Sequence, residues 1–208
     1  MGNASNLLTV ALVSFLAVVS PGPDFLIVVK NSLTYSRKIG FLTTIGISLA
    51  LLIHLSYTLI GIGMVMTEGS ILYLILKYCG AGYLFYIGVK GLLSSFKKQN
   101  HLNFANSGQV ATLSHAAALK QGFLTNLLNP KCALFFISFF SQFVLASTPL
   151  ALKISYACIN WAITLSWFFA LSYLITGKFI LTRIDRFRLY VDRVMGIVLI
   201  AVSLKLIF

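Results

Sequence analysis

The sequence predicts an all-α integral membrane protein of six transmembrane helices, arranged as two inverted-topology repeats of three helices. Three observations predict this fold: an apolar composition, an alternation of charge between apolar segments, and an internal repeat with proline breaks at matching places. Of the 208 residues, 59% are hydrophobic and only 10% are charged. A soluble domain cannot bury that much apolar surface, so we expect the chain to lie in a lipid bilayer.

Six segments are long and apolar enough to cross a membrane, which takes about 20 residues of helix. They are Leu7–Val29, Gly40–Met66, Ser70–Leu93, Leu119–Phe143, Pro149–Thr176 and Val191–Phe208. The polar stretch 94–118 is the one long linker. The chain therefore divides into a first three-helix repeat (1–93), a cytoplasmic linker (94–118) and a second three-helix repeat (119–208), which together form one membrane domain.

The basic residues indicate how these segments are oriented. The net charge is +12, but Lys and Arg lie between apolar segments and form no solvated face or arm, so we expect no nucleic-acid partner. The second and fourth connections contain no Lys or Arg. By the positive-inside rule the other three are cytoplasmic and both termini lie outside. Their basic residues are Lys30, Arg37 and Lys38; Lys97 and Lys98; and Lys178, Arg183, Arg186 and Arg188.

An internal repeat relates the two halves of the chain. Leu55–Gly61 (LSYTLIG) resembles Leu171–Gly177 (LSYLITG), and in each half a glycine follows the serine of this motif by 24 residues (56 to 80, 172 to 196). In the first segment of each half, Pro23–Val29 (PDFLIVV) aligns with Pro130–Phe136 (PKCALFF). Because each half has an odd number of segments, the halves insert in opposite directions. Transporters built this way hold their site near the midplane, between the repeats.

Each half breaks its first segment with proline. The breaks are Ser20-Pro21-Gly22-Pro23 and Asn129-Pro130. Proline interrupts a helix but suits the first turn of a new one, so we expect Ser20 and Asn129 to cap helices that restart inside the membrane. A restarting helix offers free N–H groups and the positive end of its dipole, which suit an anion such as a substrate carboxylate. Both breaks are therefore candidate parts of a substrate or ion site.

Asp24 and Lys131 follow the two prolines at matching positions of the repeat. Charges inside a membrane are costly and by default functional. An acid beside a base could hold a zwitterion, with its ammonium group on Asp24 and its carboxylate on Lys131 and the helix ends. Asp24 could also carry a proton. Two plainer alternatives stay open: the two residues pair with each other, or Asp24 only satisfies the dipole of its helix.

The other polar residues within the segments are weaker candidates. His54 either relays protons or makes structural hydrogen bonds. Asn126 precedes the second break and either caps a helix or contacts the ligand. Three further residues are expected to make hydrogen bonds between helices, namely Gln121, Asn160 and Thr164.

Four stretches resemble the LysE/RhtB family, the lysine and homoserine/threonine exporters. They are SPGPDFLIV at the first break, GISLALLIH (Gly46–His54), LKYCGAGYLFYIGVKG (Leu76–Gly91) and GFLTNLLNPKCALFFISFFSQFV (Gly122–Val144). The Asn-Pro-Lys region is the most specific of these, and the resemblance runs from about Ser20 to the C-terminus.

The resemblance implies a secondary exporter of amino acids in the bacterial cytoplasmic (inner) membrane, driven by a proton or potential gradient. Its expected partners are a small amino acid, protons and the lipid bilayer. Glycine-rich packing faces permit a homo-oligomer without requiring one. Members of the family accept basic, neutral or other small amino acids, so the substrate stays open. Some members carry a neutral amide where this chain has Asp24, and no substrate charge follows from that difference.

Two other classes of membrane protein fit the sequence less well. A cation or heavy-metal exporter of the same superfamily is the alternative, but it needs several His, Asp or Cys ligands, and His54 is alone in its segment. A redox carrier needs a cysteine at each break, whereas Cys132 is matched by Phe25 in the first half. We therefore expect a transporter, not an enzyme, without a cofactor or a resident metal.

Overall fold

The computed structural model describes residues 2–65, 71–96, 112–144, 147–175, 189–190 and 193–204. Within these ranges every regular element is an α-helix and none is a strand, which confirms the all-α prediction. The helices are α1 (Gly2–Val19), α2 (Pro23–Thr34), α3 (Arg37–Val65), α4 (Ile71–Ser94), α5 (His115–Leu127), α6 (Pro130–Phe143), α7 (Leu150–Leu174) and a last helix, Arg193–Leu204.

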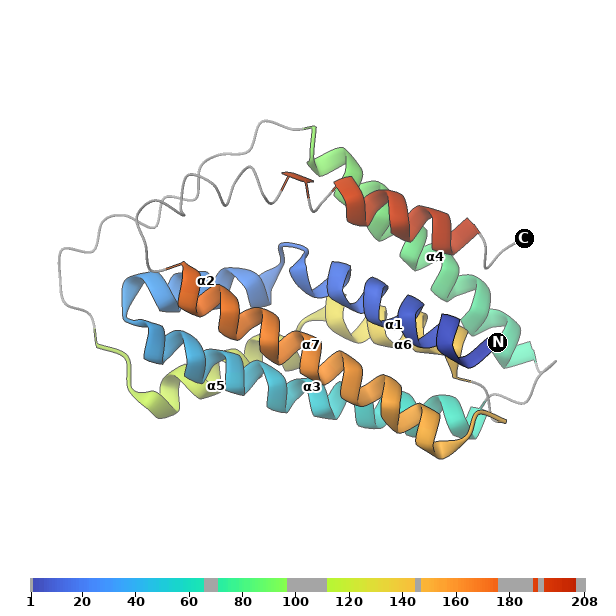
Figure 1. The fold of residues 1–208 in the computed structure, drawn as a ribbon, viewed down its shortest axis with the longest axis horizontal. Helices are drawn as coiled ribbons and strands as arrows, with labels where there is room; N and C mark the ends of the chain where they lie inside the picture. The colour runs from blue at the N-terminus through green and yellow to red at the C-terminus, as the bar shows by residue number, and fades with distance from the viewer. Residues whose placement is uncertain are drawn as a thin grey trace.

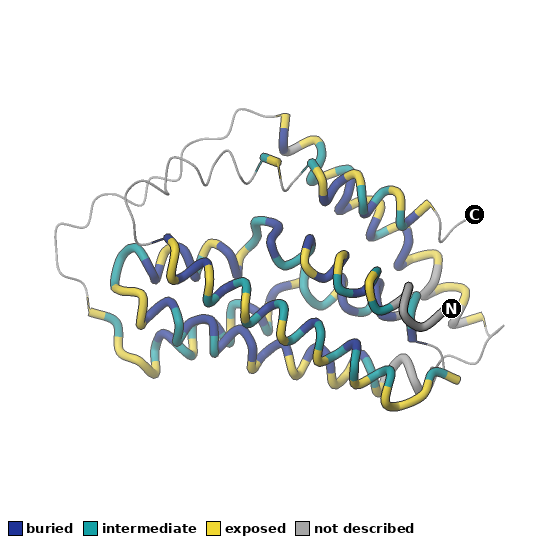
Figure 2. Tube along the Cα trace, viewed as in Figure 1, coloured by how far each residue is buried: buried dark blue, intermediate teal, exposed yellow. Residues whose placement is uncertain are grey.

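The helices form a bundle with an extra pair along one side (Figure 1). In the bundle α3 packs along α5 and α7, and α1 packs on α7. The extra pair is α4 and the last helix, which approach closely where Gly88 meets Gly196, and α4 packs on α6. Buried residues gather on the sides of the helices that face one another (Figure 2). The centre of the bundle is thus enclosed by α1, α2, α3, α5, α6 and α7.

Two described helices are long and apolar enough to cross a membrane, Arg37–Ile60 and Leu150–Leu174. Two bent pairs also qualify if each is one span: Leu7–Val19 with Pro23–Thr34, bent by 55°, and His115–Leu127 with Pro130–Phe140, bent by 52°. The last helix is apolar but shorter, and residues 205–208 of the predicted sixth segment lie outside the described residues. The described residues therefore give two to four candidate spans.

Both predicted helix breaks are present, but only one is capped as predicted. Pro130 begins α6, and the Asn129 side chain accepts a hydrogen bond from the Lys131 backbone N–H at 3.0 Å. At the other break the prediction that Ser20 caps the new helix is wrong. Because Pro23 takes the first helical position, the N-cap is the extended residue Gly22, which has no side chain to accept a bond.

Helix α5 begins four residues before the predicted segment at Leu119. The Ser114 hydroxyl accepts from the Ala117 backbone N–H at 3.2 Å, and the three alanines that follow His115 favour helix, so this end of the stretch 94–118 is helical. Residues 97–111 of that predicted linker lie outside the described residues.

Two glycines let α3 and α5 lie backbone to backbone. A Cβ atom on Gly46 would meet the carbonyl oxygen of Leu119, and one on Gly122 would meet the carbonyl oxygen of Thr43. Close approach through small residues is a common way for membrane helices to associate. This contact holds the end of α5, and so the second break, against α3.

Candidate functional site

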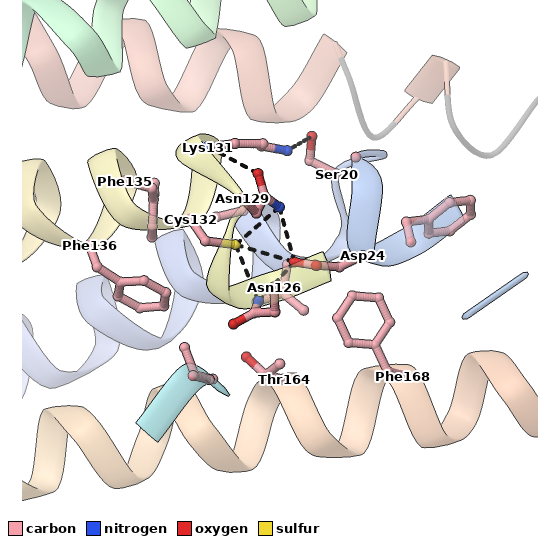
Figure 3. Close-up of a pocket in the computed structure, with 15 residues that line it drawn as sticks. Ser20, Asp24, Asn126, Asn129, Lys131, Cys132, Phe135, Phe136, Thr164 and Phe168 are labelled. Atoms are coloured by element: carbon pink, nitrogen blue, oxygen red, sulfur yellow. Dashed lines mark hydrogen bonds between the residues drawn. The ribbon is translucent and has the colours of Figure 1, made fainter. Parts of the chain in front are cut away.

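The two helix breaks meet at a cavity of about 50 Å³ inside the bundle, here called the buried cavity (Figure 3). It lies between the start of α2, the end of α5, the start of α6 and the middle of α7. Its polar lining includes Asp24, Asn126, Asn129, Lys131, Cys132 and Thr164, and its apolar lining includes Phe25, Leu51, Phe135, Phe136 and Phe168.

The Asp24 carboxylate is buried at the first turn of α2 and is held by three neutral donors. Its Oδ2 accepts from Asn126 Nδ2 at 2.9 Å, from Asn129 Nδ2 at 3.2 Å and from Cys132 Sγ at 3.2 Å. These donors come from the last turn of α5, the second break and the first turn of α6. The predicted candidates Asp24, Asn126 and Asn129 are thus in direct contact.

The Cys132 thiol completes this network, which the sequence argument did not anticipate. Besides donating to Asp24, its sulfur accepts from Asn126 Nδ2 and Asn129 Nδ2, both at 3.4 Å. Its place directly after Lys131, in the aligned part of the repeat, was the only signal available. That alignment pairs it with Phe25, so no symmetry pointed to a polar role.

Lys131 reaches from the start of α6 to the other break. Its Nζ donates to the Ser20 hydroxyl at 2.9 Å, while the Ser20 backbone N–H bonds the Leu16 carbonyl at the end of α1. The ammonium group thus lies by the C-terminal, partially negative end of α1. Asp24 and Lys131 therefore line the same cavity, where Asp24 accepts from Asn126 and Lys131 donates to Ser20.

His54 is on α3, next to Asn126 of α5, and it does not line the buried cavity. Its Nε2 is 3.0 Å from the Asn126 carbonyl oxygen, and its Nδ1 is 2.6 Å from the Tyr57 hydroxyl. Because a carbonyl can only accept, Nε2 carries the proton and a neutral ring accepts from Tyr57 at Nδ1. The ring also stacks on Phe136. In the described part of the chain, hydrogen bonds link His54 to Asp24 through Asn126.

The interhelical hydrogen bonds expected of Gln121 and Asn160 are confirmed. Gln121 accepts from Asn31 Nδ2 at 3.1 Å, and Asn160 Nδ2 donates to the Ser14 hydroxyl at 2.8 Å. The same expectation for Thr164 is wrong. Its hydroxyl has no hydrogen-bond partner among the described residues and belongs to the wall of the buried cavity, because α7 turns this face towards the breaks.

A larger hollow of about 560 Å³, the outer pocket, lies between the breaks and α4. Four residues line both the outer pocket and the buried cavity, so Lys131 stands at the boundary between them. These four are Ser20, Gly22, Asn129 and Lys131; the outer pocket adds Pro21, Pro23 and Pro130 from the breaks, and Tyr83, Tyr86, Ile87, Lys90, Leu134 and Met195 among its other walls. All the candidate residues of the two breaks therefore border one or both hollows.

Within the described part of the chain, no three His, Cys, Asp or Glu residues come together in a way that could hold a metal ion. Asp24 and Cys132 are in contact, but their other neighbours are the amides of Asn126 and Asn129. The donors around Asp24 thus suit a hydrogen-bonded carboxylate better than a metal ligand.

The sequence of the chain is similar to those of known proteins. Residues 15–208 match the family described as LysE type translocator. The chain is 28% identical over 204 residues to the uncharacterized membrane protein YrhP of Bacillus subtilis (strain 168), which covers 96% of this chain and 97% of that protein. It is 31% identical over 166 residues to the threonine efflux protein of Salmonella typhi (77% of each) and 33% identical over 137 residues to that of Escherichia coli (strain K12; 66% of each). No solved structure matches the chain significantly.

Proposed function

The chain belongs to the family of LysE type translocators, as its sequence motifs predict, and we propose that it is a secondary active exporter of a small amino acid or a derivative of one. It works across the cytoplasmic membrane, with protons as the exchanged ion. Relatives that match 77% of the chain carry the name threonine efflux protein, so L-threonine is the first substrate to test.

One observation carries this proposal: an acid and a base, each just after the proline that restarts a helix, line a single buried cavity. A zwitterion needs both charges, because its ammonium group pairs with a carboxylate and its carboxylate group with a cation. Asp24 serves the first and Lys131 the second. Helix starts and broken helices at the middle of a bundle are the usual setting for such sites in transporters.

Asp24 also supplies a simple coupling to protons. A buried carboxylate is unfavourable when it carries an unbalanced charge, so Asp24 holds either the substrate ammonium or a proton. Loading of substrate from the cytoplasm releases the proton, and release of substrate outside allows a proton to return. Each cycle thus moves one amino acid out against one proton in.

The proposal includes six spans in two inverted repeats with both termini outside. It is supported by the matched bends of 55° and 52° and by the proline that begins both α2 and α6. The first helix of each half breaks at the equivalent place, as inverted-repeat transporters require around a midplane site.

The test is uptake into inside-out vesicles, where an exporter accumulates its substrate. Labelled amino acids, L-threonine first, and divalent metal ions are offered with and without an acid-inside pH gradient. We expect the gradient to drive uptake of an amino acid, and Asp24→Asn to insert normally but lose this dependence on pH. Uptake of a metal ion alone would favour the cation exporter instead.

A further inference from the structure

Three residues that line the buried cavity each carry a buried oxygen atom with no hydrogen-bond partner among the described residues. The atoms are Asp24 Oδ1, Asn126 Oδ1 and Thr164 Oγ1, from α2, α5 and α7. Their residues are only 7%, 2% and 4% exposed. Buried polar groups in native proteins nearly always have partners, and one left without costs stability. Three such residues lie around one small cavity, so a ligand group with several donors in that cavity would supply the missing partners.

The chemistry of these atoms specifies that group. Asp24 Oδ1 can only accept when ionised. Asn126 Oδ1 carries no hydrogen and can only accept, while the nitrogen of the same amide donates to Asp24 and Cys132. The ligand group must therefore bring hydrogen-bond donors and interact favourably with the negative charge of Asp24. A carboxylate brings no donor, and a hydroxyl brings one.

Thr164 differs from several other buried hydroxyls of these helices, which bond to their own backbone. Thr43, Thr44 and Ser172 each donate to a backbone carbonyl four residues back in their own helix. Thr164 makes no such bond and lies on the wall of the cavity opposite Lys131 and Ser20 (Figure 3). Its lone pairs and its proton are thus available to a ligand in the cavity.

We propose that the three oxygens receive the three N–H donors of the substrate's α-ammonium group, which enters the buried cavity while the rest of the amino acid stays outside it. This rests on the proposed function and adds an orientation to it. The carboxylate lies at Lys131, on the boundary, and the side chain lies in the outer pocket.

The sizes of the two hollows support this orientation. The buried cavity, at about 50 Å³, is far below the roughly 300–1,000 Å³ of ligand pockets, so it suits a head group and not a whole amino acid. The outer pocket, at about 560 Å³, is within that range, and its walls mix aromatic, aliphatic and lysine side chains. The site therefore selects for an unsubstituted ammonium group and accepts side chains of different size and polarity.

The first test needs no variant. Exchange of labelled L-threonine is measured in proteoliposomes that hold the full chain, with L-serine or N-methyl-L-serine as competitor. The two competitors share side chain and carboxylate, but the methyl group removes one N–H donor and adds bulk in the cavity. We expect N-methyl-L-serine to compete about tenfold more weakly or worse, because a hydrogen bond to a charged group is lost.

The second test compares two matched threonines. Thr164→Val keeps the shape but removes the hydroxyl, and we expect it to raise the half-saturating concentration of L-threonine about tenfold. Thr58→Val is the control, because Thr58 is equally buried and its hydroxyl also has no partner among the described residues, but it lines neither hollow. It should leave the concentration unchanged.

The outcomes separate this inference from the proposed function. Equal competition by N-methyl-L-serine, or no effect of Thr164→Val, overturns the orientation while export stands. Exchange that needs Na⁺ and tolerates N-methylation also overturns it, since the oxygens would then ligate an inorganic cation. A wild-type protein that exchanges no amino acid overturns the proposed function, and the inference with it.

Discussion

At the residue scale, Asp24 shows how a carboxylate is kept in an apolar bundle. Three neutral donors bond to its Oδ2, and its buried Oδ1 has no hydrogen-bond partner among the described residues. Asp24 lies in the first turn of α2, directly after Pro23, which agrees with one of the alternatives that the sequence left open. The donors from Asn126 and Cys132 are more than 100 positions away in the chain, and no local pattern encodes such contacts.

His54 has contacts that favour a positioning role over proton relay. Its Nε2–H donates to the Asn126 carbonyl, one of the last carbonyls of α5, which also accepts from the Asn129 backbone N–H at 3.0 Å. The bond fixes the end of α5, from which Asn126 reaches Asp24. The sequence alone does not separate the two roles, because a histidine in an apolar helix can relay protons or make structural hydrogen bonds.

Substitution of His54 separates these roles. His54→Gln keeps an N–H donor at similar reach, so we expect export and its pH profile to stay close to wild type. His54→Leu leaves the carbonyl with one donor fewer, and we expect the export rate to fall roughly three- to tenfold. Both are measured by vesicle uptake across a pH series. A relay histidine would behave differently: glutamine cannot titrate, so the pH profile would be lost with either change.

At the scale of the helices, the two breaks show where neighbouring residues are enough to predict how a helix is capped. Asn129 and Pro130 form a cap and a first turn that depend only on neighbours along the chain, and the prediction there is confirmed. At the first break either of two prolines, Pro21 or Pro23, could occupy the first position of the new helix. Pro23 takes it, and the Ser20 hydroxyl instead accepts from Lys131, a contact between helices that sequence spacing could not reveal.

The crossing of α3 and α5 gives a prediction about stability. In Gly122→Ala the new Cβ meets the Thr43 carbonyl, which is backbone and cannot turn aside, so we expect a loss of about 1–3 kcal/mol in the free energy of unfolding. Gly82→Ala is the matched control in α4, since nothing lies within 4 Å of its Cβ. Thermal unfolding in detergent measures both.

The control should be neutral or slightly stabilising, because alanine is a better helix former than glycine by roughly 0.5–1 kcal/mol. Equal midpoints for Gly122→Ala and Gly82→Ala would show that the α3–α5 crossing relaxes at little cost. A larger loss for Gly122→Ala, with reduced export in the same variant, would tie the crossing to the placement of the second break.

At the scale of the whole molecule, the charge of the connections predicts orientation in the membrane. We expect Ser5→Cys to react with an impermeant thiol reagent in intact cells, and Ser107→Cys in the linker to react only after permeabilisation. Both are made in a background without the three native cysteines, provided that export is retained when Cys132 is replaced by serine. An N-terminal cysteine shielded in intact cells would reverse the assignment.

Composition, charge pattern and proline spacing were sufficient to predict an all-α membrane chain with two broken helices, because each depends on local residue chemistry or on a preference for lipid over water. They also placed Asp24, Asn129 and Lys131 at the breaks. Tertiary structure alone decided which polar atoms share a cavity: the partners of Asp24, the reach of Lys131 to Ser20, and the open hydroxyl of Thr164. Such contacts join helices remote in sequence, and they arise only when packing turns one face of each helix towards the same point.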